Sequence, residues 1–349
     1  MKISYIDYKN LLKFTKNILK KVGLNKFSYD AVSYGLCEAS LRGVDSHGIR
    51  LLDHYIKSAL SERKNSTPNF KLYKKYPSIL TLDADNAFGL AAGFKAIDIG
   101  IKTANKQGMC AISVKNSSHA ASMASMALRA ARKNFICFAF TNADSLMTSY
   151  NGLNNLFGTN PICFAAPRIE KTPFCLDMAT TNVSWNHILE LRASKKKIKG
   201  DYAVDDKGKI TYDPNKAVGL TPIGLYKGFG LATMVDILCG LYNGTNLSHE
   251  LPSMFTSPLQ KKRKVSQFYI LLKIDGAISN KIFKNKMQEL TNKIRRQKPI
   301  RNKKVMASND PQINFEKERL KNGIPLQNNI YKMLKKYEQL YNCKLDEKK

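Results

Sequence analysis

The chain has 349 residues, of which 43% are apolar and 24% charged, and its formal net charge is +30 at pH 7. This composition is typical of a globular protein and excludes a disordered or fibrous chain. A chain of this length exceeds the size at which one hydrophobic core usually stops growing, so we expect two domains, sequential or interleaved.

The positive charge has two interpretations. Lysine and arginine neutralise phosphates in nucleic-acid-binding surfaces. In this chain, however, lysine is spread along the whole length, and its densest runs are 194–200, 260–264 and 292–304. The last two runs contain no aromatic residue that could stack on bases. We therefore expect solvated faces rather than a nucleic-acid site, with a positive field that attracts anionic ligands.

The sequence predicts a soluble cytoplasmic protein. Lysines interrupt segment 1–24, which lacks the apolar block of a secretory signal. No segment reaches the ~18 consecutive apolar residues of a membrane span. The seven cysteines, an odd number without a C-x-x-C pair, indicate a reducing compartment. Since no two histidines have a helical ligand spacing, we expect no metal site.

The first 65 residues predict helices. Apolar residues recur at helical spacing over 11–22, and 28–43 predicts a second helix with Ser28 as its N-cap and an end near Gly43. From about residue 77, strands and helices alternate, which is typical of an α/β protein. The predicted segments are a strand and turn at 78–89, a helix at 93–108, a strand and polar loop at 109–120, a helix at 122–134 and a strand at 135–144.

Two apolar runs that end in polar loops follow, at 156–167 and 174–185, and such loops are where ligands usually bind. Segment 202–214 predicts a surface hairpin with its turn at 206–208. Glycines open a buried helix in 223–244. A strand in 267–275 precedes basic helices that continue to the end of the chain.

Two histidines are candidates for acid–base chemistry. His47 lies with Asp45, Ser46 and Arg50 within six positions, at the break after the second predicted helix. His119 lies at a predicted strand-to-helix junction, where backbone amides and the helix dipole can lower an imidazole pKa and fix its tautomer. A hydrogen-bonded structural role is the commoner one for a lone histidine. We expect that role for the other three, His54, His187 and His249.

Two common enzyme motifs are missing from the sequence. A serine hydrolase of the α/β type needs a G-x-S-x-G nucleophile elbow, and none is present. The segment GLYKGFGLAT gives G-x-G-x-x-T and does not follow a clear strand, so a Rossmann site is not predicted. Lys227 lies among these glycines, which let the backbone approach a phosphate. From spacing alone, a solvated lysine at a helix start is an equal alternative.

Seven segments in order resemble one family: RGVDSHGI, NSSHA, LFGTNPICFAAP, LDMATT, DDKGKITYDP, YKGFGLATMVDIL and RLKNGIPL. They are similar to the type-2 malate/L-lactate dehydrogenases over about residues 1–330. Within that family, FCLDMATTNVSW, PSMF and MKIS are most similar to ureidoglycolate dehydrogenase.

The resemblance implies an oxidoreductase that uses NAD or NADP to interconvert a small anionic 2-hydroxy acid, such as malate, lactate or ureidoglycolate, with its 2-oxo acid. It implies an α/β fold whose mixed or antiparallel sheet, flanked by helices, binds nicotinamide without a Rossmann motif. We expect a helical part at 1–75, a cofactor-binding domain at 76–270 and a C-terminal helical part at 271–349 packed on the first. A homodimer is expected, with no nucleic-acid or membrane partner.

The resemblance also implies roles for single residues. His119 matches a proton acceptor and His47 a proton donor, and which of the two is the base stays open. Asp144 matches a pocket position from which it could orient a histidine. Ser46 and Tyr55 match substrate-pocket positions.

Further positions match the cofactor site of the family. Lys227 matches a lysine that contacts the cofactor phosphates, which favours its functional interpretation. The loop that holds the nicotinamide end matches Asp177, Met178, Ala179, Thr180 and Thr181.

The chain departs from the family at two places. In the family, an arginine four positions after the SHG histidine grips the substrate carboxylate, and Leu51 occupies that position here. Arg50, one position earlier, is the candidate substitute; whether it is equivalent stays open, because one residue rotates a helical side chain by about 100°. The cofactor loop of PGE type is replaced by Ser308, Asn309 and Asp310, which puts cofactor affinity in question. These departures leave a degenerate, cofactor-binding member without turnover as the alternative.

Overall fold

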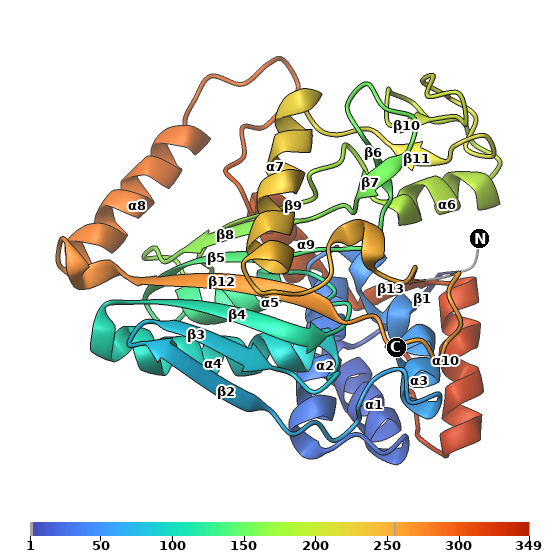
Figure 1. Ribbon diagram of the computed structural model, residues 1–349, viewed down its shortest axis with the longest axis horizontal. Helices are drawn as coiled ribbons and strands as arrows, with labels where there is room; N and C mark the ends of the chain where they lie inside the picture. Colours follow the sequence, from blue (N-terminus) through green and yellow to red (C-terminus); the bar gives the residue numbers. More distant parts are fainter. Residues whose placement is uncertain (1–2, 255, 349) are drawn as a thin grey trace.

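A seven-stranded mixed sheet forms the centre of the computed structural model, which describes residues 3–254 and 256–348 (Figure 1). Met1, Lys2 and Phe255, from the MKIS and PSMF segments, lie outside the described residues. Strands β3 and β4 run parallel, and the other neighbouring pairs of this sheet run antiparallel. The spatial order is β2 (Lys71–Tyr76), β3 (Ile79–Asp83), β4 (Met109–Ser117), β12 (Val265–Lys273), β5 (Phe135–Thr141), β8 (Ile162–Ala166) and β9 (Phe174–Met178).

Burial explains which strands were visible in the sequence. The predicted strands β3, β4, β5 and β12 are confirmed, and their buried apolar residues supply much of the main core. The edge strand β2 was missed, because all six of its residues are exposed and three of them are lysines. Charged, solvated residues are a common protection for an edge strand, but they carry no apolar period.

Helices cover both faces of the sheet. Helix α4 (Gly89–Gln107) packs on β4 and β12, and α5 (Ala124–Ala131) packs on β5 and β8. On the opposite face, α7 (Tyr226–Asp236) and its π-helical continuation η3 (Ile237–Leu241) pack on β5 and β12 (Figure 1).

Segments from the first and the last parts of the described chain lie side by side. Strand β1 (Ile3–Ile6) pairs antiparallel with β13 (Ile324–Gln327), and α1 (Tyr8–Lys21) packs on both α2 (Lys26–Leu41) and α10 (Asn328–Tyr341). The prediction of helices alone was wrong here, since strands of four residues are too short to show a period. The predicted N-cap Ser28 was also wrong: the side chain of Asn25 accepts the backbone N–H of Ser28.

A smaller four-stranded sheet projects from the first. Helix α6 (Trp185–Ala193) covers it through a separate small core that includes Ile188 and Leu220. The predicted hairpin is confirmed by the bond from Asp205 N to Lys209 O and by the bridge between Val204 and Ile210. The strands are, in spatial order, β10 (Ala203–Val204), β11 (Gly219–Leu220), β6 (Met147–Thr148) and β7 (Asn155–Phe157).

The remaining elements connect these layers. Within the described residues, no helix is long and apolar enough to cross a membrane. The elements are η1 (Asp45–His47), η2 (Ile49–Leu51), α3 (Leu52–Leu60), η4 (Ser248–Glu250), η5 (Ile274–Gly276), α8 (Asn280–Arg295) and α9 (Asp310–Asn322).

The expectation that the basic runs are solvated was wrong at two arginines. Arg263, in the run 260–264, is buried and forms an ion pair with Asp144. Arg295, in the run 292–304, forms ion pairs with Glu170 and Asp310. Part of the positive charge is therefore internal and paired.

Candidate functional site

The two candidate histidines meet where the N-terminal helices contact the sheet. His47 ends η1, and His119 follows β4 in the loop that leads to α5. Their rings are stacked, with centroids 5.8 Å apart and an interplanar angle of 20°. Both side chains are only partly exposed. Two segments that are distant in the sequence thus supply one pair of imidazoles.

Close packing explains the glycine after His47. A Cβ on Gly48 would lie 2.1 Å from Ser40 Oγ, so only glycine lets this turn rest on α2. The Ser40 hydroxyl accepts the backbone N–H of Ile49 at 2.8 Å. The SHG motif therefore places His47 by backbone contact with a helix.

Tyr55 of α3 holds the ring of His119. The hydroxyl donates to the backbone carbonyl of His119 at 3.0 Å and lies 3.1 Å from Nδ1 of the same residue. A hydroxyl has one hydrogen. With that hydrogen on the carbonyl, the oxygen accepts from Nδ1–H, and we assign the free lone pair of His119 to Nε2. Tyr55 is fully buried, and its hydroxyl is engaged in this way; its expected place in the substrate pocket stays a prediction.

Burial keeps both imidazoles neutral near pH 7. The pKa of His119 lies well below its usual value, chiefly through burial and then through repulsion by His47, when that ring is protonated, and by the charge of Arg263. Burial also lowers the pKa of His47; Asp177 opposes this shift, and Arg50 adds to it. The neighbouring His54 has its pKa lowered to about 3 by burial and by Lys64. A neutral imidazole can accept a proton.

Asp144 does not contact either candidate histidine. One carboxylate oxygen pairs with Arg263, and the other accepts the backbone N–H of Met254 at 3.0 Å. The expectation that Asp144 orients a histidine is corrected accordingly: this role falls to Tyr55, while Ser46 Oγ lies 2.8 Å from Nδ1 of His47.

Arg50 points to helix α6. Its guanidinium pairs with Glu190, while Leu51 is buried in the main core. A second contact joins the same helix to the histidine segment, because Asn186 Nδ2 donates to the carbonyl of Ser46 at 3.3 Å. The charge of Arg50 is near enough to lower the pKa of His47. These contacts place α6 against the segment 46–50.

A cavity of about 410 Å³ lies beside the loop that joins His119 to α5, and Ser122 of that loop lines it. Asp177, at the end of β9, lines it, and its Oδ2 accepts from Ser122 Oγ at 2.8 Å and from the backbone of Ala124 at 2.9 Å, the first residue of α5. The lining also includes Arg42 of the RGVDSHGI motif, together with Ser308 and Asn309. Of the predicted cofactor residues, Asp177, Ser308 and Asn309 therefore share one cavity.

The other four predicted cofactor residues of the segment 177–181 follow Asp177 in the chain but do not line the cavity. Met178 and Ala179 follow Asp177 and are half-buried. Thr180 is buried, and its hydroxyl donates to Thr159 O at 3.0 Å; Thr181 is also buried, and its hydroxyl donates to Val183 O at 2.8 Å. Both hydroxyls therefore stabilise the loop through hydrogen bonds to backbone carbonyls.

Lys227 is exposed in the first turn of α7 and does not line the cavity. A Cβ on Gly228 would lie 2.1 Å from Ile223 O, which explains the glycine that follows this lysine. The preceding Leu225 has φ of 59°, an unusual conformation for a branched side chain. The turn before α7 therefore combines a close backbone contact at Gly228 with a positive φ at Leu225.

Asn309 fixes the conformation of the loop 307–309 before α9. Its φ is 79°, a left-handed conformation that glycine and asparagine tolerate best. Its Oδ1 accepts from Arg42, and its Nδ2 donates to Pro173 O at 3.0 Å. Asparagine therefore suits a position where the sequence comparison expects the glycine of a PGE-type loop, because both residues tolerate this conformation.

The sequence interpretation missed several of these residues. Arg42 lies inside a quoted motif and could have been found there. Arg263 and Glu190 carried no local signal, because their importance depends on partners more than a hundred positions away. Within residues 3–254 and 256–348, no group of three or more His, Cys, Asp or Glu side chains could hold a metal ion.

Comparisons with known proteins identify the family of the chain. The family model described as malate/L-lactate dehydrogenase matches residues 6–335. A malate dehydrogenase of Pyrococcus abyssi is 32% identical over 90% of this chain and 89% of its own length. The ureidoglycolate dehydrogenase (NAD(+)) of Escherichia coli is 29% identical over 98% of both chains.

A solved structure gives the same result for the fold. The crystal structure of malate dehydrogenase from Entamoeba histolytica superimposes with a TM-score of 0.93 at 23% identity, and the match covers 99% of both chains. The family model and these relatives extend over nearly the whole chain, which therefore belongs to the malate/L-lactate dehydrogenase family.

Proposed function

We propose that the protein transfers a hydride between nicotinamide and a small 2-hydroxy or 2-oxo acid. The observation that carries the proposal is the pair formed by His47 and His119 beside the 410 Å³ cavity, with the His119 ring held by Tyr55. Bound NAD or NADP would supply the hydride acceptor or donor. The relatives named malate and ureidoglycolate dehydrogenase support this class of substrate.

His119 is proposed as the general base for oxidation. As the hydride leaves the carbinol carbon, Nε2 of His119 accepts the hydroxyl proton, and the carbonyl double bond forms. The support is the Nδ1–H held by Tyr55, which leaves Nε2 free. His47 would polarise the same oxygen, with Ser46 holding its other nitrogen.

Arg50 is proposed as the carboxylate-binding residue in place of the missing family arginine. A guanidinium binds a carboxylate through two parallel bonds. Glu190 now occupies this position on Arg50, so the acid would replace Glu190 as the partner. The 240 Å³ cavity lined by Arg50, Glu190 and Ile49 offers adjoining space.

The cofactor is proposed to bind along the loops that contain Asp177, Ser308 and Asn309, with Lys227 near its phosphates. The fit rests on the cavity, on the N-terminus of α5 and on Arg42, whose buried Nε lacks a hydrogen-bond partner among the described residues. Because the sheet is mostly antiparallel, we propose nicotinamide binding without a Rossmann unit. The paired strands β1 and β13 support one helical domain built from both chain ends.

We further propose a cytoplasmic homodimer. The described cysteines are free and buried, which suits a reducing compartment. Large apolar side chains remain exposed on α7 and η3, and Met234, Ile237 and Leu241 follow helical spacing. A partner chain on this face would cover them. Light scattering should give a dimer for the native protein and a monomer for Leu241→Asp.

One assay tests the proposed function. Purified protein is incubated with NADH or NADPH and a panel of 2-oxo acids, including oxalurate, while nicotinamide absorbance is followed. Oxidation of the cofactor that His119→Ala and His47→Ala abolish is the expected result. Cofactor binding without turnover would favour the degenerate alternative, and the absence of both would contradict the proposal.

A further inference from the structure

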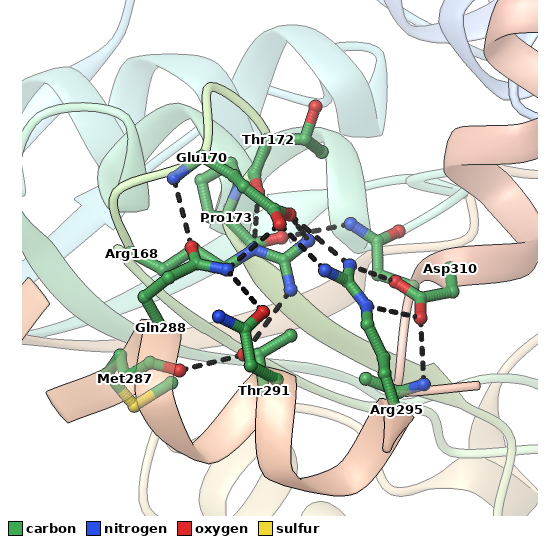
Figure 2. Close-up of polar contacts among 12 residues, drawn as sticks. Arg168, Glu170, Thr172, Pro173, Met287, Gln288, Thr291, Arg295 and Asp310 are labelled. Carbon is green, nitrogen blue, oxygen red and sulfur yellow. Dashed lines mark hydrogen bonds and ion pairs between the residues drawn. The ribbon is translucent and has the colours of Figure 1, made fainter. Parts of the chain in front are cut away.

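A network of charged side chains joins α8 to the loop before α9 (Figure 2). Arg295, the last residue of α8, donates to Asp310 through Nε at 2.9 Å and through Nη2 at 2.6 Å. The same guanidinium donates to Glu170 through Nη1 at 2.7 Å and Nη2 at 3.2 Å. One arginine thus holds two carboxylates from distant parts of the chain.

Glu170 is a fixed anchor for this arginine. It lies in the turn between β8 and β9, where the fully buried Arg168 guanidinium approaches its Oε2 to 2.9 Å. Gln288 of α8 donates to Glu170 Oε1 at 2.9 Å and accepts the Glu170 backbone N–H at 3.2 Å. Arg168 Nε also donates to Thr172 O at 2.9 Å and fixes the turn (Figure 2).

Asp310 transmits this anchoring to the cavity. It is the first residue of α9, and its Oδ2 accepts the backbone N–H of Ala307 at 2.8 Å. Ala307, Ser308 and Asn309 line the 410 Å³ cavity, whereas Arg295 does not. Asp310 therefore lies between the partly exposed charged network and the loop that borders the cavity.

The charges of the network persist at neutral pH. Hydrogen bonds from Arg295 lower the pKa of Asp310 and the pKa of Glu170. A guanidinium with five donors can bind two carboxylates at once, whereas the ammonium group of lysine acts as a point charge. The identity of residue 295 as arginine is thus chemically meaningful.

We infer that Arg295 is a positioning residue for dinucleotide binding, which acts through Asp310 on the loop 307–309. The inference rests on the proposed function, because it needs this cavity to be the cofactor site. A loop that is already ordered loses less conformational entropy when a ligand binds. Removal of Arg295 would free the loop and weaken cofactor binding, while the histidine pair stays intact.

The test measures the Kd of NADH, and separately of NADPH, by fluorescence titration. Arg295→Gln should raise the Kd roughly tenfold, a change of about 1.4 kcal/mol. Arg295→Lys should give an intermediate value. The matched control is Arg296→Gln, since Arg296 is the next residue and its side chain is exposed. The Kd of the Arg296→Gln variant for NADH and NADPH should equal that of the native protein.

Steady-state kinetics separate positioning from a general structural effect. The KM for cofactor should rise in Arg295→Gln, while the KM for the 2-oxo acid and kcat at saturating cofactor stay unchanged. The double variant with Asp310→Asn should bind cofactor more tightly than the product of the single effects predicts. If Arg295→Gln does not fold, as judged by thermal unfolding, Asp310→Asn alone should raise the Kd.

Three outcomes would overturn the inference. The first is an unchanged Kd in folded Arg295→Gln or Asp310→Asn. The second is a fall in kcat together with a similar rise in the KM values for cofactor and for 2-oxo acid, which would indicate general disruption. The third is native protein that binds neither NADH nor NADPH, which would also refute the proposed function; the first two outcomes leave that function standing.

Discussion

The hydroxyl of Tyr55 offers a direct test of the catalytic proposal. Tyr55→Phe removes one oxygen atom and leaves the ring, which is fully buried and stacked near Phe88. Without that oxygen, the Nδ1–H and the backbone carbonyl of His119 both lose their partner. The imidazole is then no longer held as the tautomer with a free Nε2, and the ring can rotate.

The magnitude follows from the two lost contacts. A buried donor or acceptor without a partner costs about 1–3 kcal/mol. Because two such groups lose their partner, we expect the free energy of unfolding to fall by about 2–6 kcal/mol. When the hydrogen of His119 moves to Nε2, this atom can no longer accept the hydroxyl proton of the substrate. We therefore expect kcat for oxidation of the hydroxy acid to fall about tenfold to a hundredfold, at about 1.4 kcal/mol per tenfold.

The assay compares Tyr55→Phe with Tyr337→Phe, a control that also removes a buried hydroxyl. Tyr337 donates to Asp53 at 2.7 Å and belongs to α10. Both variants should lose stability in thermal unfolding, but only Tyr55→Phe should lose kcat. Equal kcat in the native protein and in folded Tyr55→Phe would refute the role of Tyr55 in holding His119.

Further predictions concern substrate binding, pH and the cofactor loop. Glu190→Gln should lower the KM for 2-oxo acids several-fold because it frees Arg50, and an unchanged or higher KM would contradict competition between Glu190 and the substrate. Because the pKa of His119 is lowered, kcat/KM for oxidation should stay constant as pH falls through about 6.5, the usual imidazole pKa, and decline only at lower pH; a decline centred at or above 6.5 would contradict the assignment. Asn309→Ala should destabilise the protein by about 1–2 kcal/mol more than Asn309→Gly, since alanine resists the left-handed conformation, and equal unfolding temperatures for the two variants would contradict this account.

Local patterns in the sequence determined the family and much of the secondary structure. Ordered motifs identified the malate/L-lactate dehydrogenase family, which the family model confirms over residues 6–335. Buried strands such as β4 and β5 were visible because burial leaves an apolar run in the sequence. His47 and His119 could be selected as candidates for a different reason, since each lies in a short segment of distinctive composition.

Only the tertiary structure decided which distant residues meet. Strand β12, from the later part of the chain, lies between β4 and β5, and no local period records that order. Tyr55, expected at the substrate pocket, holds the ring of His119. Asp144 was expected to orient a histidine, but it pairs with Arg263. Charged side chains look alike in a sequence whether water or another charge satisfies them, because their partner is set by packing between segments and not by their neighbours along the chain.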